Sequence, residues 1–290
     1  MKLILATRKS ILAQTQTDMV IEGIKNRHEV ECEKLLIETL GDKILDRTLD
    51  KIGGKGLFIK EIEAALLEDK AHIAVHSMKD MPYELHEELK IAAVPEREDV
   101  RDVFISNDGT PFMELPKGAK VGTSSRRRAS QLKLLREDIE IVPIRGNVQT
   151  RIRKIKELGL NGTVLAAAGL NRLDMKDVVA NYFEINQMIP AIGQGALGVE
   201  TRIGARSFDY VKHLDHTDTR ICVEAERSFM KELKGDCQST IGAHAKLYGD
   251  MIYMVGIYEI GGRIIKKDIE GKREEFINLG KNLAKKITMD

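Results

Sequence analysis

The sequence predicts an α/β fold of two successive α/β units followed by a small α+β tail. Short apolar runs with strand character alternate with amphipathic helical patterns through most of the chain. After about residue 240 the pattern changes to long strands around a turn at Gly261 and Gly262, which indicates an antiparallel sheet. At 290 residues the chain is long enough for two or three domains.

The first unit begins with the strand-like run LILAT. A helix is expected over 10–25, with Ile11 and Met19 among the residues that should face inward. Residues 40–56 mix charge and glycine without periodicity, which predicts a long loop of the kind that is usually functional. The other elements expected here are an amphipathic helix at 57–69 and strands at 3–7, 32–39, 71–77 and 89–95.

The second unit repeats this alternation. Its first helix, 124–138, begins at a serine N-cap, and its second, 147–159, ends at a glycine. After the segment 189–201 a helix-rich stretch runs to about Leu233, and a final helix is expected over roughly 273–287. The strands expected in this unit are 102–106, 119–123, 139–145 and 162–169.

Arginine is concentrated in one part of an otherwise neutral chain. Lys and Arg total 46 against 45 for Asp and Glu, which gives a formal net charge of +1. Residues 122–131 nevertheless read GTSSRRRASQ, and residues 145–151 read RGNVQTR. A planar guanidinium suits carboxylate or phosphate, so this cluster predicts a site for a particular anion. The neutral total and the 4% of aromatic residues argue against a nucleic-acid binder.

The positions of the arginines support an anion site. The N-terminus of helix 124–138 attracts anions through its backbone N–H groups. Three arginines in its first turn oppose the helix dipole, so an external anion is expected to offset them. A solvated basic face is the alternative interpretation. Thr7 and Arg8, the stretch 77–80, and Arg145 also follow predicted strands, where ligand sites of open α/β sheets collect.

Asp80 is the acid that stands nearest to this pattern. It follows a predicted strand in the motif HSMKDMP, next to Lys79. A lone acid in such a place can simply cap the following turn. In a cationic cleft, however, the carboxylate would stay ionised at neutral pH, stabilise a developing cation and relay protons. The residues alone leave both interpretations open.

Three cysteines, Cys32, Cys222 and Cys237, are too few and too irregular for a disulfide framework or a zinc cluster, and no metal site is expected. Cys32 and Cys222 fall in predicted elements and are interpreted as packing residues. Cys237 follows a predicted helix end, in the loop KGDCQSTIG, where its sulfur should be accessible. No histidine is adjacent to act as its base, so a covalent anchor is favoured over a protease nucleophile.

The chain carries no pattern of a secreted or membrane protein. The apolar run VLAAAGL at 164–170 is far too short to span a bilayer. The N-terminal run is interrupted by Arg8 and Lys9, which favours a first strand over a signal peptide. With so few cysteines, a reducing cytoplasm is the simplest location.

Eight motifs occur in the order seen in one known family. They are ATRKS with Gln16, GGKGLFIKEIE, IAVHSMKDMP, GTSSRRR, RGNVQTR, AAAGLNRL, GQGALGVE and LKGDCQSTIGA. On these motifs the chain, from residue 4 to about 250, resembles the hydroxymethylbilane synthase (porphobilinogen deaminase) family. The resemblance implies two periplasmic-binding-protein-like α/β domains and a small C-terminal α+β domain. The implied bounds are 1–98 with 191–216 for domain 1, 99–190 for domain 2 and 217–290 for domain 3.

The resemblance also implies a transferase reaction and a cofactor. Four porphobilinogen molecules would be joined head to tail, each losing ammonia, and water would release linear hydroxymethylbilane for tetrapyrrole and haem biosynthesis. The family's cofactor is a dipyrromethane, linked as a thioether to the cysteine that matches Cys237. Each pyrrole carries an acetate and a propionate, so the growing chain is a polyanion to which arginines are suited. A monomer is implied as well.

The family's functional positions carry over residue by residue. Asp80 matches the catalytic acid. The positions that match cofactor contacts are Ser77, Lys79, Thr123, Ser125, Arg127, Arg128 and Arg151. The positions that match the substrate side are Arg8, Ser10, Gln16, Arg145, Arg172 and Gln194, while Lys55 and Phe58 match a mobile loop over the cleft.

Three positions depart from the family pattern. Asp236 and Thr240 stand where the family usually has glycine and proline, and Asp236 adds a negative charge beside the anchoring cysteine. Arg126 stands where the family often has an apolar residue, and we expect it to face solvent. A non-catalytic anion-binding module remains the main alternative, although it explains the arginines without explaining Asp80 or Cys237.

Overall fold

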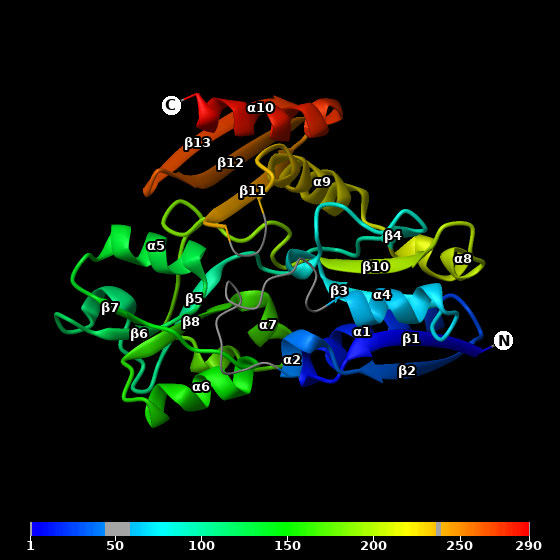
Figure 1. Cartoon of the computed structure of the whole chain (residues 1–290), viewed down its shortest axis with the longest axis horizontal. Helices are drawn as coiled ribbons and strands as arrows, with labels where there is room; N and C mark the ends of the chain where they lie inside the picture. The colour runs from blue at the N-terminus through cyan, green and yellow to red at the C-terminus, as the bar shows by residue number, and fades with distance from the viewer. Residues whose placement is uncertain (1, 44–58, 236–238, 290) are drawn as a thin grey trace.

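The computed structural model describes residues 2–43, 59–235 and 239–289. These residues form two five-stranded sheets and one three-stranded sheet. In Figure 1 the first sheet lies at the lower right, the second at the lower left, and the third lies above both beneath the C-terminal helix. The expected fold class, an α/β protein with a small C-terminal α+β unit, is therefore confirmed.

The first sheet has the strand order β2-β1-β3-β10-β4. Its strands are β1 (Lys2–Arg8), β2 (Glu31–Ile37), β3 (Ile73–Ser77), β4 (Leu89–Ala93) and β10 (Leu197–Arg202). β1 runs parallel to β2 and β3, whereas β10 runs antiparallel to β3 and β4, so the chain returns to this sheet late in the sequence. The helices of this unit are α1 (Ile11–Lys25), α2 (Leu40–Lys43), α4 (Lys60–Leu67) and α8 (Ser207–Val211).

The second sheet has the order β7-β6-β8-β5-β9. Its strands are β5 (Asp102–Ser106), β6 (Lys120–Gly122), β7 (Glu140–Val142), β8 (Gly162–Ala166) and β9 (Asn181–Tyr182), and its helices are α5 (Arg126–Leu135), α6 (Val148–Glu157) and α7 (Ala167–Arg172). Phe112 packs edge-to-face against both Phe104 and Phe183 in the core beneath α5. Short 3-10 helices lie at Met78–Asp80, Phe112–Glu114, Lys176–Val178, Lys212–Leu214 and Arg273–Glu275.

The C-terminal unit is an antiparallel sheet covered by two helices. It comprises α9 (Thr217–Glu232), β11 (Ile241–Tyr248), β12 (Met251–Ile260), β13 (Arg263–Lys272) and α10 (Phe276–Thr288). The helices α9 and α10 cross closely at Gly280, where an added Cβ would stand only 2.2 Å from the carbonyl oxygen of Ala225. Phe229 and Leu283 fill the core between these helices and the sheet.

Some expectations for individual elements were wrong. The predicted strand 162–169 ends at Ala166, and helix α7 begins at Ala167 because the Ala-rich run that follows favours a helix. The predicted loop 40–56 begins with α2, and its part from residue 44 lies outside the described residues. Ile11 and Met19 are 57% and 47% exposed, because α1 packs on its sheet through Val20 and neighbouring positions instead.

Candidate active site

Asp80 lies in a short 3-10 turn at the end of β3. The turn is anchored because the N–H of Met78 donates to the carbonyl of Ala196 at 3.0 Å, which continues the pairing of β3 with β10. Met78 and Met81 are 1% and 2% exposed and pack where Gly198 lacks a side chain; a Cβ there would stand 2.6 Å from the sulfur of Met81. The methionines are thus buried, while Asp80 is left half-buried.

Two polar residues of α1 lie beside this turn. The Gln16 amide and the Ser77 hydroxyl are within hydrogen-bond distance, with Nε2 to Oγ at 3.0 Å and Oγ to Oε1 at 3.1 Å. Ser10 caps α1, since its Oγ accepts the N–H of Ala13 at 3.3 Å. Arg8 ends β1 and is half-buried. The structure therefore places Arg8, Ser10, Gln16 and Ser77 at one end of the first sheet.

Lys79 places a cation next to Asp80. Burial, followed by the nearby charge of Arg128, lowers the pKa of Lys79 to about 8, although Asp80 and Asp102 oppose this shift. The Lys79 ammonium also lies 3.5 Å from Oε1 of Gln194. The electrostatic influence of Arg128 on Lys79 shows that the arginine helix of the second unit faces the Asp80 turn of the first.

Arg127 and Arg128 are buried on a single internal carboxylate. Arg127 donates from Nη1 to Oδ2 of Asp102 and to the carbonyl of Ile189, both at 2.7 Å. Arg128 donates from Nε and Nη2 to Oδ1 of Asp102, at 3.1 and 2.7 Å, and from Nη1 to the carbonyl of Val164 at 2.9 Å. Burial alone would raise the pKa of Asp102, but the two guanidiniums hold it well below its ordinary value.

The anion that meets this arginine pair is therefore part of the protein, whereas the sequence predicted an external one. Helix α5 begins at Ser125, whose Oγ accepts the N–H of Arg128 at 3.4 Å, and the Ser125 N–H lies 3.2 Å from Oγ1 of Thr123. Arg126 is exposed, as expected. Nothing in the sequence linked Asp102 to arginines that lie 25 and 26 positions further along the chain.

Arg145 and Arg151 add further positive charge. Arg151 donates from Nε to the carbonyl of Gly146 at 2.8 Å, in the turn that leads into α6. Burial, followed by repulsion from Arg128 and Arg145, lowers the pKa of Arg151 to about 10, and Asp80 opposes this shift. These couplings bring Arg128, Arg145 and Arg151 to the same region as Asp80, so one carboxylate stands among several cations.

Gln194 lies at the crossing between the first two units. It is fully buried, and its Nε2 donates to the carbonyl of Val100 at 2.8 Å and to Oδ1 of Asp102 at 3.0 Å. Its own carbonyl accepts from Nε of Arg97 at 2.8 Å. Arg97 in turn forms a two-fold ion pair with Glu226, at 2.7 and 2.9 Å. Sequence analysis missed Arg97, Asp102 and Glu226, because a charged residue gives no sign that it will be buried by a distant partner.

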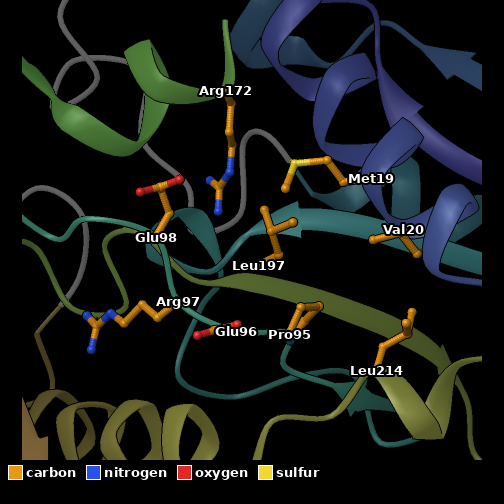
Figure 2. A pocket seen from close by; sticks show the side chains of 9 residues that line it. All are labelled: Met19, Val20, Pro95, Glu96, Arg97, Glu98, Arg172, Leu197 and Leu214. Carbon is orange, nitrogen blue, oxygen red and sulfur yellow. The ribbon is translucent and has the colours of Figure 1, made fainter. Parts of the chain in front are cut away.

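A cavity of about 440 Å³ flanks this crossing. It is lined by Met19, Val20, Pro95, Glu96, Arg97, Glu98, Arg172, Leu197 and Leu214. Figure 2 shows the guanidinium of Arg172 and the carboxylate of Glu98 facing the same part of it. Arg172 donates from Nη2 to the carbonyl of Gly195 at 2.6 Å, and burial lowers its pKa. Arg172 thus lies beside the crossing segment rather than next to Asp80 in the contacts described.

Three candidate residues, Lys55, Phe58 and Cys237, lie outside the described residues. Within the described ranges, no group of three or more His, Cys, Asp or Glu side chains is arranged to hold a metal ion. His76 instead lies 3.0 Å from the buried Glu200, and His216 caps α9. No helix in the same ranges is long and apolar enough to cross a membrane.

Comparison with known proteins identifies the family. The model described as "Porphobilinogen deaminase, dipyromethane cofactor binding domain" matches residues 3–209, and the model of the porphobilinogen deaminase C-terminal domain matches residues 220–289. The chain belongs to the porphobilinogen deaminase family. It is 58% identical to the porphobilinogen deaminase of Clostridium acetobutylicum and 56% identical to that of Clostridium botulinum, over 290 residues and the full length of each protein.

Structural similarity to other solved proteins is weaker. A periplasmic arginine-binding protein of Salmonella typhimurium matches 73% of this chain and 91% of its own, with 14% identity and a TM-score of 0.41. The substrate-binding domain of a molybdenum transporter from Clostridium difficile matches 73% and 90%, with 11% identity and a TM-score of 0.44.

As a porphobilinogen deaminase, the chain is a transferase of tetrapyrrole biosynthesis that polymerises porphobilinogen, and its first matched region is the part that binds a dipyrromethane cofactor. The described residues fit such a group. Lys79 and Arg151 have lowered pKa values partly because neighbouring arginines repel them, and the carboxylates of a dipyrromethane would relieve that repulsion.

Proposed function

We propose that the region around Asp80 joins four porphobilinogen molecules head to tail, releasing one ammonia at each step, and that water then releases linear hydroxymethylbilane. The observation that supports this most directly is the single carboxylate of Asp80 among the cations Lys79, Arg128, Arg145 and Arg151. The cations suit a substrate that carries two carboxylates on each ring, and the lone acid suits chemistry that passes through a cation.

Asp80 has two tasks in this proposal. Departure of ammonia leaves a cationic carbon on the substrate, and an ionised carboxylate beside it stabilises that charge. The same carboxylate holds the proton of the pyrrole nitrogen and passes protons during the loss of ammonia. Lys79 and Arg151 keep Asp80 ionised, because a nearby positive charge favours the carboxylate form.

The remaining residues bind and orient. We assign the cofactor carboxylates to Ser77, Lys79, Thr123, Ser125, Arg127, Arg128 and Arg151, and the incoming substrate to Arg8, Ser10, Gln16, Arg145, Arg172 and Gln194, with Lys55 and Phe58 closing over them. Arg127 and Gln194 are buried on protein partners, so in this proposal they act mainly by holding Arg128 and the crossing segment in place. When bound, the dipyrromethane supplies the pyrrole carbon to which the first substrate is joined.

We further propose that the cofactor is a thioether of Cys237 and that the chain is a cytoplasmic monomer of three domains. Helix α9 ends at Glu232 and leads toward that cysteine. Domain 1 would comprise 1–98 and 191–216, in keeping with the return of β10 to the first sheet. Domains 2 and 3 would comprise 99–190 and 217–290, in keeping with the second and third sheets.

Two measurements test the proposal. Protein made in a host that synthesises porphobilinogen should exceed its sequence mass by one dipyrromethane, and acidic Ehrlich reagent should give a coloured product. A bare sequence mass would rule out the covalent cofactor. The variant Asp80→Ala should carry the same added mass but show almost no turnover, and near-normal turnover would remove Asp80 from the mechanism.

A further inference from the structure

One buried arginine of the C-terminal unit contacts both arms of the Asp80 turn. Arg227, on α9, is 7% exposed. Its Nη2 donates to the carbonyl of Pro82 at 2.7 Å and lies 3.3 Å from the carbonyl of Tyr83, and its Nη1 lies 3.9 Å from the sulfur of Met78. Met78 precedes Asp80 by two positions, and Pro82 follows it by two. The guanidinium therefore spans the turn from the side that the active site does not use.

The two arms of this turn are held by different units of the fold. On the upstream arm, the Met78 N–H donates to Ala196 in the crossing segment of the first unit. On the downstream arm, the carbonyls of Pro82 and Tyr83 accept from Arg227. Val223, one turn earlier on α9, adds apolar contact with Met78 and Met81. Helix α9 thus packs against the whole back of the turn.

The chemistry of Arg227 also favours a geometric task. Among the ion pairs that the described residues form, Arg227 takes part in none, and its hydrogen bonds go to neutral backbone carbonyls. Burial lowers its pKa, with Glu224 and Glu200 opposing. Burying a charge without an adjacent counter-ion is costly. A planar fork of donors that meets two carbonyls at fixed angles is the property that distinguishes arginine from a smaller or apolar residue here.

The neighbouring residue ties the same helix to the crossing segment. Glu226 accepts from both Nη atoms of Arg97 and from the N–H of Gly193 at 2.7 Å. We infer that Arg227 is a positioning residue for Asp80: it fixes the turn against α9, the helix that leads to Cys237, and so sets where the acid stands relative to the cofactor end of the chain. This inference rests on the proposed role of Asp80.

The test compares Arg227→Met and Arg227→Lys with the native enzyme, each carrying its cofactor. Arg227→Met keeps the length of the side chain and removes the fork, so kcat should fall about 10- to 100-fold, as expected for a small misplacement of a reacting group. The KM for porphobilinogen should change less than about two-fold, because the substrate-side cations stay in place. Arg227→Lys, which can still donate to a carbonyl, should recover part of kcat even if Arg227→Met folds poorly.

Arg220→Met is the matched control. Arg220 lies on the same helix and is half-buried, but it pairs with Asp215 at 2.8 Å and not with the turn. Its replacement should leave kcat within about two-fold at a similar loss of thermal stability. An equal fall of kcat in the Arg220 and Arg227 variants would show that general destabilisation is responsible, and would overturn the inference.

A double-mutant cycle with Asp80→Glu, which retains a carboxylate, provides the second readout. If Arg227 acts through Asp80, Arg227→Met should reduce kcat far less in the Asp80→Glu background than in the native one. Equal losses in both backgrounds would contradict the inference. Failure of the wider proposal is separate, since Asp80→Ala alone would then keep near-normal turnover. If Asp80→Ala is inactive and Arg227→Met is normal, only the role of Arg227 is refuted.

Discussion

Replacing Asp102 with asparagine should destabilise the protein through the buried arginine pair. Asp102 is fully buried and accepts hydrogen bonds from Arg127, Arg128 and Gln194. Asparagine keeps the shape but removes the charge, and its amide group would turn donors toward guanidiniums that are themselves donors. Breaking a buried ion pair by removing one partner costs about 3–5 kcal/mol. Here two buried cations lose the same carboxylate, so the upper part of that range is expected.

The assay is thermal unfolding of Asp102→Asn beside Asp138→Asn. At about 2–4 °C per kcal/mol, the buried substitution should lower the apparent midpoint by at least about 6 °C. Asp138 forms a similar pair with Arg136, but toward solvent, and its replacement should lower the midpoint by less than about 2 °C. If the two variants unfold at the same temperature, the argument that burial makes the Asp102 pair costly to break is wrong.

The dependence on pH gives an independent check. The folded-state pKa of Asp102 is lowered, so the stability that it contributes is present above its unfolded pKa of about 3.9 and is lost as the pH falls through the folded value. The difference in midpoint between the native protein and Asp102→Asn should therefore stay constant from about pH 8 to 5 and shrink only below about pH 4. A difference that vanished near pH 6 would point to a histidine instead.

Two glycine substitutions test the packing around the site. Gly198→Ala places a Cβ 2.6 Å from the sulfur of Met81, a flexible side-chain end, so the Asp80 turn should shift, and steady-state kinetics should show a lower kcat with only modest loss of stability. Gly162→Ala places its Cβ 2.5 Å from the carbonyl oxygen of Ile105, which cannot yield, and calorimetry should show a large loss of stability. Gly169→Ala, with contacts no closer than 3.5 Å, should leave both quantities nearly unchanged.

The sequence predicted the elements that depend on local pattern. The helix over 10–25 and the position of Asp80 after a strand follow from periodicity, a serine cap and strand composition, and the structure confirms them. The exposure of Ile11 and Met19 could not be predicted, because periodicity shows which residues share a helix face but not which face meets the sheet. Met19 instead lines the cavity beside the crossing segment.

Long-range polar contacts were beyond prediction for a different reason. Glu226 accepts from Arg97, 129 positions earlier, and from the backbone of Gly193 and Ala245, and these contacts lower its pKa to about 2 despite its burial. A helix that carries glutamate and arginine side by side is usually interpreted as solvated. Only the folded chain shows that both Glu226 and Arg227 are buried, since their partners lie in other units.

The three consecutive arginines show how strongly helix geometry divides adjacent residues. Successive side chains on a helix point about 100° apart, so neighbours of one chemical type cannot share one environment. Arg126 is exposed, while Arg127 and Arg128 approach the two oxygens of Asp102 from different sides, at 2.7 Å each. Asp102 offsets part of their charge, so the cations that act on Asp80 come from several elements rather than one run. A net positive site therefore needs Arg145 and Arg151 on the α6 turn, and losing either should weaken anion binding more than losing Arg126.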